Sequence, residues 1–459
     1  MQPSWQRLLA LAGLLAGLGG ASVEASTNLL IWNHSGDRVT ADVRGWPLLG
    51  LLEAIAAQSG WQVRVEPDLE QPASVKFKNL PSGEALRLLL GELNYALVPQ
   101  TNGPARFYVF RTARDRATQL IRAASEKEEA CQPKRVPNEL IVRLKPGGDI
   151  EQLARLFGAK VTGRIPELNT YRLEFGDEAA ADNARKLLAD TTGVASVDYN
   201  YYFERPQPTR EFTGAGPAAL SLQLRPPGDS GRVIVGLVDT AVQPLGGNLD
   251  AFLLKQLSIA GAVALDPNSP MHGTSMAETI LRSLEAVTKG NTSVQILPVD
   301  VYGANRETTT WNVALGIVAA VNSGANPINL SLGSSVNSPV LQDLVAAVAA
   351  RGVVLFAAAG NEPVSTPYYP AAYAEVTAVT GGNKAKISSY ANFGSFVDVV
   401  APDANVVSFA NRQWYVVGTS AATAFTTGVA AGLADQTGQS WSSILRVIQQ
   451  NYPVPAPSK

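Results

Sequence analysis

Gly418-Thr419-Ser420-Ala421 opens a run of alanine, threonine and glycine that continues to Ala431. This stretch predicts a serine that follows a small-residue turn and stands at the start of a helix. Backbone N–H groups and the helix dipole stabilise developing negative charge at such a position. The serine can act as a nucleophile if a base and an oxyanion-binding group lie beside it. Taken alone, the stretch is more simply interpreted as the serine N-cap of a buried, alanine-rich helix.

The chain is long enough for about two to four domains. It has 459 residues, of which 46% are hydrophobic and 17% charged, and its formal net charge is −2. This balance gives no reason to expect a nucleic-acid partner or binding to an anionic membrane. The single cysteine, Cys131, excludes an intramolecular disulfide and a thiolate metal cluster.

Residues 1–25 have the pattern of a signal peptide. Arg7 provides a positive flank, residues 8–18 an apolar run, and residues 23–25 a small-residue cleavage pattern. The apolar run is short and interrupted by glycine, which disfavours a membrane span, and an uncleaved N-terminal anchor is the alternative. No later stretch reaches about eighteen apolar residues. We therefore expect a soluble protein that is exported to the periplasm or the extracellular medium.

Residues 27–112 form a first predicted module. Apolar periodicity predicts helices over 47–60 and 82–94 and strands over 39–43, 61–66, 75–80, 95–99 and 106–111. The resulting order, β-α-β-β-α-β-β, indicates a small α+β module without a catalytic cluster. It resembles the short N-terminal domain of secretins and TonB-dependent receptors, which implies a partner in the cell envelope.

Two linkers flank a second predicted module. Residues 113–137 are charged and contain prolines, so they are interpreted as a linker in which Cys131 is an incidental thiol. Residues 138–205 show the order β-α-β-β-α-β, which is ferredoxin-like. Residues 206–230 are rich in proline and glycine and are interpreted as a second linker.

Residues 231–459 show a different pattern, with apolar strands that alternate with helices. Such alternation is typical of an α/β domain with a largely parallel sheet, whose strands are buried on both faces. The pattern predicts strands over 233–238, 294–299, 328–332 and 353–358, and helices over 274–284, 309–321, 339–350 and 440–450.

Polar residues follow this pattern at places where α/β domains form sites. Asp239 directly follows the strand over 233–238, and sites in open α/β sheets form at the carboxyl ends of strands. The chain has only two histidines, and His34 lies in the first module, so His272 is the candidate base for Ser420. Asp239 is then the candidate that orients the imidazole and stabilises its charged form. Taken singly, Asp239 and His272 are equally explained as turn or cap residues.

Asn361 supplies a candidate for the remaining part of such a site. It follows a buried strand and the sequence Ala357-Ala358-Ala359-Gly360. Its side-chain amide can donate a hydrogen bond to an oxyanion, a contact worth about 10²–10³-fold in rate. Taken alone, it is a turn residue after glycine.

In chain order, these residues resemble the motifs of the subtilases, whose triad runs Asp, His, Ser. The motifs are Val238-Asp239-Thr240, His272-Gly273-Thr274, Asn329-Leu330-Ser331-Leu332-Gly333, Ala359-Gly360-Asn361 and Gly418-Thr419-Ser420. The resemblance covers roughly residues 230–450. It implies a subtilisin-like catalytic domain with a mostly parallel sheet and a serine endopeptidase that acts on proteins or peptides.

The resemblance implies a role for each residue. Ser420 would be the nucleophile, His272 the general base and then acid, and Asp239 the residue that orients the imidazole. Asn361 and the Ser420 backbone N–H would form the oxyanion hole. Substrate backbone would pair with Ser331, Leu332 and Gly333, and the main specificity pocket would be lined by Ala357, Ala358, Ala359 and Gly360. These alanines predict a roomy, apolar pocket.

The resemblance also reinterprets residues 138–205. Subtilases commonly carry a ferredoxin-like propeptide that assists folding, occupies the cleft as an intramolecular inhibitor and is then removed. Residues 199–205 would enter the cleft, and cleavage is expected between about residues 203 and 217. The chain is therefore expected to be an autoprocessed precursor.

Several positions depart from the subtilase pattern, namely Ala241, Ser275, Glu278, Ala421 and Ala424. Glu278 matters most, because a charged residue on a tightly packed helix needs a partner or solvent. These departures keep an alternative open, a catalytically weak or inactive subtilase-like protein that binds a partner in the envelope. The sequence identifies no cofactor. Structural calcium is common in the family, but no acidic loop here allows its ligands to be assigned.

Other hydrolase classes fit the sequence less well. An α/β-hydrolase requires a histidine after the nucleophile, and no histidine follows residue 272. A zinc peptidase with the H-E-x-x-H motif is excluded because that motif is absent.

Overall fold

The computed structural model divides into two compact units, residues 1–128 and 129–459. The described residues are 28–33, 37–66, 69, 71–100, 104–117, 119–121, 133–206, 210–211, 222–225, 233–263 and 265–455. The predicted signal peptide, His34 and Cys131 lie outside them. None of the described helices is long and apolar enough to cross a membrane.

In the first unit, the described residues form two small sheets and two α-helices around one core. Its sheets have the strand orders β1-β2-β4 and β5-β6-β3-β7. The elements are β1 (Leu29–Asn33), β2 (Arg38–Trp46), α1 (Leu48–Ser59), β3 (Gln62–Val65), β4 (Ala73–Pro81), α2 (Ser82–Leu90), β5 (Asn94–Val98), β6 (Arg106–Phe110) and β7 (Gln119–Ile121). Leu51, Leu52 and Ile55 of α1 are fully buried, so the predicted apolar face of this helix forms the centre of the core.

Two strands of this unit are missing from the prediction. β7 pairs antiparallel with β3 and lies within the segment predicted to be a linker, so the unit extends beyond residue 112 to Ile121. β1 pairs with β2 ahead of the predicted first strand. The three residues of β7 are too few to show a period. The five residues of β1 are almost all apolar, so they show no alternation either. The resemblance to the short N-terminal domain remains a prediction.

The second unit begins with the ferredoxin-like module. Its strands form an antiparallel sheet in the order β11-β8-β10-β9. The elements are β8 (Arg135–Leu144), α4 (Ile150–Phe157), β9 (Lys160–Ile165), β10 (Thr170–Glu174), α5 (Glu178–Ala189) and β11 (Val194–Glu204). Asp149 and Asp177 cap the two helices through their carboxylates. The element order agrees with the prediction, but the first strand begins at Arg135, within the predicted linker.

The rest of the unit is organised around a parallel sheet in the order β14-β15-β13-β17-β18-β19-β20. Its strands are β13 (Ile234–Asp239), β14 (Leu257–Ser258), β15 (Gln295–Asp300), β17 (Ile328–Leu330), β18 (Leu355–Ala358), β19 (Val376–Gly381) and β20 (Val399–Ala401). The predicted parallel α/β architecture is confirmed. β14 and β20 are too short to show a pattern in the sequence.

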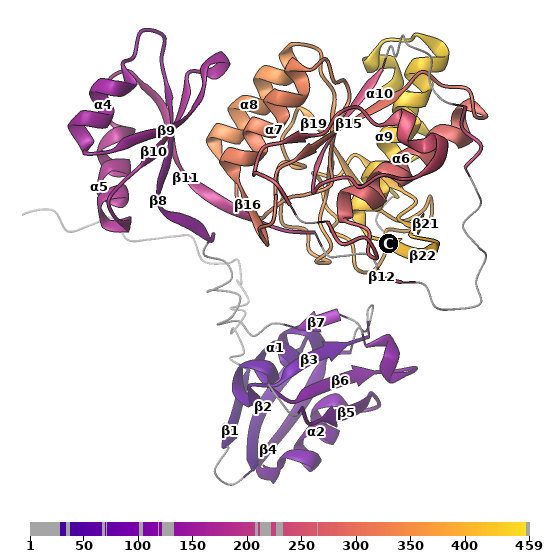
Figure 1. The fold of residues 1–459 in the computed structure, drawn as a ribbon. Coiled ribbons are helices and arrows are strands. Elements are labelled where there is room, and N and C mark those ends of the chain that lie inside the picture. Colours follow the sequence, from indigo (N-terminus) through magenta and orange to yellow (C-terminus); the bar gives the residue numbers. More distant parts are fainter. Residues whose placement is uncertain are drawn as a thin grey trace, which may run out of the picture. The chain divides into compact units, whose positions relative to one another are not determined.

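Helices cover both faces of this sheet (Figure 1). They are α6 (His272–Thr288), α7 (Thr310–Asn322), α8 (Pro339–Ala350), α9 (Thr419–Thr437) and α10 (Trp441–Asn451). Successive side chains of β13 point to opposite faces of the sheet. Val238 belongs to the core cluster that contains residues of α7 and α8, and Leu237 belongs to the cluster that contains residues of α6 and α9. α6 and α9 approach closely, because a Cβ atom at Gly428 would lie 2.6 Å from the Ile280 carbonyl oxygen. The small residues after Ser420 therefore serve helix packing.

The ferredoxin-like module docks on the parallel-sheet domain through its last strand (Figure 1). β11 pairs antiparallel with β16 (Glu307–Thr309), with Phe203 opposite Thr308. Trp311 packs against Gly163, where a Cβ atom would lie 2.4 Å from the indole ring. A second contact lies after β11 in the chain: β12 (Arg210–Glu211) pairs with β22 (Arg412–Val417). β22 forms a hairpin with β21 (Ala404–Phe409) and is followed by α9.

Candidate active site

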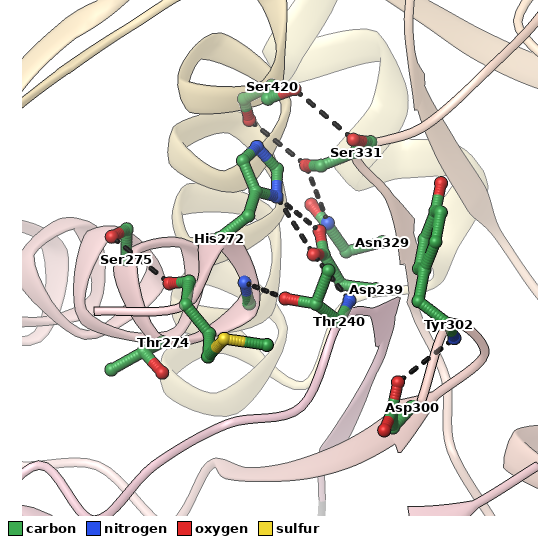
Figure 2. A network of polar contacts seen from close by, with 12 residues as sticks. Asp239, Thr240, His272, Thr274, Ser275, Asp300, Tyr302, Asn329, Ser331 and Ser420 are labelled. Carbon is green, nitrogen blue, oxygen red and sulfur yellow. Dashed lines mark hydrogen bonds and ion pairs between the residues drawn. The ribbon is translucent and has the colours of Figure 1, made fainter. Parts of the chain in front are cut away.

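The carboxyl edge of the parallel sheet brings the three predicted triad residues together (Figure 2). Asp239 is the last residue of β13, His272 is the first residue of α6, and Ser420 is the second residue of α9. Each therefore stands where a strand ends or a helix begins. Figure 2 shows the imidazole between the Asp239 carboxylate and the Ser420 side chain.

Asp239 holds the imidazole of His272 by two short contacts. The distances from His272 Nδ1 to Asp239 Oδ1 and Oδ2 are 2.8 and 2.9 Å. Asp239 is fully buried and His272 is 8% exposed. An ion pair or hydrogen bond at this depth is strong because little water competes for it. The contact fixes Nδ1 as the protonated nitrogen and leaves Nε2 on the side of Ser420.

The loop after Asp239 fixes the start of α6. The Gly273 N–H donates to Thr240 Oγ1 at 2.8 Å. A Cβ atom at Gly273 would lie 2.2 Å from the Thr240 carbonyl oxygen, so only glycine allows this approach. Because Gly273 has no side chain, the start of α6, which carries His272, can lie directly against the end of β13.

Ser420 is held by a reciprocal pair of hydrogen bonds with Ser331. Ser420 Oγ donates to the Ser331 carbonyl oxygen at 3.2 Å, and Ser331 Oγ donates to the Ser420 carbonyl oxygen at 3.1 Å. The predicted nucleophile thus lies next to the segment predicted to bind substrate backbone. In the predicted role, its hydroxyl would turn from Ser331 towards His272 to transfer its proton. Catalytic hydrogen bonds often tighten only when substrate binds.

Asn361 is oriented by Thr419, the residue that precedes the predicted nucleophile. Its Oδ1 accepts from the Thr419 N–H at 2.9 Å and from Thr419 Oγ1 at 3.1 Å. Thr419 Oγ1 in turn accepts from the Gly360 N–H at 3.2 Å. These bonds to Oδ1 fix the orientation of the amide, whose nitrogen is the atom that can donate to an oxyanion.

The segments predicted to bind substrate lie at the carboxyl ends of two neighbouring strands. β17 pairs with β18, and Ser331, Leu332 and Gly333 follow the first of them. Ala357 and Ala358 end the second, and Ala359 and Gly360 follow it. The three alanines are buried at 0, 3 and 0% exposure. They do not line a roomy pocket, because the Tyr368 ring lies between Gly333 and Gly360.

Glu278 has the partner that the sequence could not name. Its carboxylate accepts from the Arg282 guanidinium, with a 2.5 Å contact at Nη2, and from the Ser408 N–H at 3.0 Å through each oxygen. The Glu278 side chain is 5% exposed and that of Arg282 17%. Burial raises the pKa of Glu278 above its usual value, and Arg282 opposes this rise. The departure is therefore a buried ion pair within α6, and the hydrogen bonds from Ser408 to Glu278 tie α6 to β21.

We predict that Arg282→Met destabilises the protein by about 3–5 kcal/mol at neutral pH, because it leaves a buried charge without its cation. The folded-state pKa of Glu278 is raised, so the full stability of the variant is present below the ordinary glutamate pKa. It is lost as the pH rises through the folded-state pKa. Denaturant unfolding at mildly acidic and neutral pH measures this. Glu278→Gln in the same chain should recover most of the loss, and an equal loss at both pH values would contradict the account.

Asp300 is a buried carboxylate that the sequence analysis missed. It lies in register with Asp239 on the neighbouring strand. Its Oδ1 accepts from the Tyr302 N–H at 3.0 Å (Figure 2) and from the Gly303 N–H at 2.9 Å. Burial raises its pKa above the usual value. Asp300 therefore shapes the turn after β15, and its place at a strand end was the available signal.

Among the described residues, no group of three or more histidine, cysteine, aspartate or glutamate side chains is arranged to hold a metal ion. The described residues therefore identify no ligands for the structural calcium that is common in the subtilases.

Two family models match the chain. Residues 231–451 match the subtilase family, and residues 121–200 match the fervidolysin N-terminal prodomain. The second match begins before the predicted start of the propeptide at residue 138, in agreement with the early start of β8.

Several known proteins are similar to the chain. Thermitase of Thermoactinomyces vulgaris is 36% identical over 227 residues, which cover 47% of this chain and 79% of thermitase. Subtilisin BL of Lederbergia lenta is 36% identical over 200 residues, or 41% of this chain and 74% of that protein. A thermophilic serine proteinase of Bacillus sp. (strain AK1) is 34% identical over 230 residues, or 49% of this chain. The match spans only 57% of that proteinase.

The fold also resembles that of a solved structure. Fervidolysin from Fervidobacterium pennivorans, a keratinolytic enzyme related to subtilisin, superposes with a TM-score of 0.55 at 20% sequence identity. The match covers 69% of this chain and 57% of fervidolysin. At this identity the likeness shows the fold alone.

Proposed function

Because the chain belongs to the subtilase family, we propose that it is a serine endopeptidase made as a precursor. The observation that carries this proposal is the buried Asp239–His272 pair beside Ser420 at the start of α9. The substrates are polypeptides, which pair with the segment from Ser331 to Gly333 as an added strand. β-strand addition supplies affinity through main-chain hydrogen bonds.

The proposed reaction begins with attack of Ser420 Oγ on the scissile carbonyl carbon. His272 Nε2 accepts the serine proton and then donates it to the departing amine, which leaves an acyl-enzyme. Water, deprotonated by the same nitrogen, releases the acid product. Asp239 remains ionised, keeps Nδ1 protonated and stabilises the imidazolium in both half-reactions.

The developing oxyanion is bound by two donors from neighbouring segments. One is the Asn361 amide nitrogen, whose direction is set by Thr419. The other is the Ser420 backbone N–H, which lies in the first turn of α9 and has no intrahelical acceptor there. Such preorganised donors stabilise the transition state more than the planar carbonyl.

The precursor part of the proposal rests on the tail of the ferredoxin-like module. Arg205 donates through its backbone N–H to the Arg306 carbonyl oxygen at 2.9 Å and through its guanidinium to the Gly303 carbonyl oxygen at 2.8 Å. Tyr302 donates through its hydroxyl to the Glu204 carbonyl oxygen at 3.1 Å. The module is therefore proposed to inhibit the enzyme until the chain is cut between about residues 203 and 217.

We predict that Arg205→Ala loosens the docked tail. The variant loses a charge-assisted hydrogen bond worth about 1.5–3 kcal/mol, which corresponds to roughly tenfold or faster exchange of the β16 amides. Hydrogen–deuterium exchange of full-length Ser420→Ala protein measures this without processing. Arg164→Ala is the matched control, because Arg164 makes an exposed ion pair with Glu151 inside the module. Equal exchange in both variants would contradict the proposed anchor.

Reaction with an alkyl fluorophosphonate tests the catalytic proposal directly. The purified protein should be labelled at Ser420, and mass analysis should find the active species cut between residues 203 and 217. Labelling without a cut would remove the precursor part alone. Absence of both would favour the alternative, a subtilase-like protein that binds an envelope partner through residues 28–121.

Export remains part of the proposal, with a periplasmic or extracellular location. It rests on the pattern of residues 1–25, which lie outside the described residues. N-terminal sequencing of the secreted or periplasmic protein measures whether that segment is removed.

A further inference from the structure

Tyr368 occupies the space where the proposed enzyme would take the side chain on the acyl side of the scissile bond. That space lies between Gly333 and Gly360, beside the oxyanion donor Asn361. A Cβ atom at Gly333 would lie 2.4 and 2.7 Å from Tyr368 Cε1 and Cδ1, and one at Gly360 would lie 3.3 Å from Tyr368 Cδ1. The ring is thus in contact with both walls.

The ring is fastened to one of those walls. Tyr368 Oη donates to the Gly333 carbonyl oxygen at 2.8 Å. Burial raises the pKa of Tyr368, so its hydroxyl stays protonated and able to donate throughout the neutral and mildly alkaline range. The Gly333 carbonyl keeps a second lone pair for a substrate N–H. The tyrosine therefore fills the space without removing the backbone acceptor.

The loop that carries Tyr368 is also fastened. Tyr369 exchanges both backbone hydrogen bonds with Ser334, at 2.7 and 2.8 Å. The Tyr369 ring packs on Tyr373, with centroids 4.9 Å apart. The buried side chain of Asn392 also faces Gly360, since a Cβ atom there would lie 2.4 Å from the Asn392 amide nitrogen. These contacts hold the backbone that carries the Tyr368 ring.

We propose that Tyr368 restricts the residue on the acyl side of the scissile bond to small side chains, so that the substrates are cut after glycine, alanine or serine. This inference rests on the proposed function and names the substrate class of that site. A pocket lined by alanine and glycine alone would accept large apolar side chains. With the tyrosine ring in place, a phenylalanine side chain of the substrate would meet volume that is already filled. A misfit of this kind lowers kcat/KM for that substrate roughly tenfold or more.

The test uses the processed enzyme and two peptide phosphonates that differ only in an alanine or phenylalanine side chain at that position. The parent should react at least about tenfold faster with the alanine probe. Tyr368→Ala should reverse the order, because it empties the space. Tyr368→Phe keeps the ring and loses the hydroxyl, so it should keep the parent preference.

The outcomes separate the two proposals. Equal rates with both probes in the parent, or an unchanged ratio in Tyr368→Ala, would overturn the role of Tyr368 while an alkyl fluorophosphonate still labels Ser420. No labelling of the parent by the alkyl probe would overturn the catalytic proposal itself, and this inference with it. If Tyr368→Ala does not fold, Tyr368→Leu provides a partial opening, and its ratio must shift towards the phenylalanine probe.

Discussion

Ser420→Ala is expected to abolish peptide hydrolysis and to leave the full-length precursor uncut. Removal of the nucleophile from a triad of this kind lowers kcat by about 10⁶-fold, because the remaining groups have no atom to form the acyl-enzyme. Among the described residues, the serine hydroxyl donates to the Ser331 carbonyl oxygen alone, so its loss should leave the fold intact. Electrophoresis of parent and variant, together with peptide hydrolysis rates, measures both effects.

Ser283→Ala is the matched control for this experiment. Ser283 lies on α6, is buried, and donates to the Thr279 carbonyl oxygen at 3.0 Å within the same helix. The control keeps the Cβ atom that faces Gly428 and touches no triad residue. It should be processed like the parent. If Ser420→Ala were also processed to the same product, the cut would be made by another enzyme or another residue.

Asp239→Asn is expected to lower kcat by about 10⁴-fold with little change in substrate affinity. The amide preserves the shape of the side chain but removes the negative charge and favours the wrong imidazole tautomer. The effect should be large here because both carboxylate oxygens lie within 2.9 Å of His272 Nδ1 in a buried position. Steady-state kinetics of the processed enzyme measure kcat and KM separately.

Asp398→Asn provides the same chemical change at a structural carboxylate. Asp398 accepts from the Ala378 N–H at 2.9 Å, and burial raises its pKa. It does not contact the triad, so its kcat should stay within about tenfold of the parent, because a substitution away from a site perturbs it little. A comparable fall in both variants would mean that loss of a buried charge, not loss of the imidazole partner, explains the result for Asp239.

The prediction of the fold worked where buried strands alternate with long helices. The strand that ends at Asp239 and the helices on both sides of the sheet follow the sequence pattern closely, because full burial leaves continuous apolar runs. Short elements such as β7 and β14 were missed, since two or three residues show no period. The boundary of the ferredoxin-like module moved for a related reason: β8 starts with Arg135, Val136 and Pro137, which resemble a linker.

The sequence by itself determined which groups are available for chemistry. A chain with two histidines, one of them in another module, leaves His272 as the base, and the order Asp239, His272, Ser420 names the family. Local periodicity also indicates where strands end and helices begin. In an open α/β sheet these positions lie along the carboxyl edge, so the sequence predicts that the three residues share that edge.

Only the tertiary structure decided what surrounds those groups. Ser408 reaches Glu278 across 130 positions of sequence, and Tyr368 reaches Gly333 across 35. Periodicity tells that a residue is buried, but it does not tell which side chain from a distant segment fills the adjacent space. For this reason the alanines near Asn361 predicted an open pocket, and the folded chain fills it with a tyrosine.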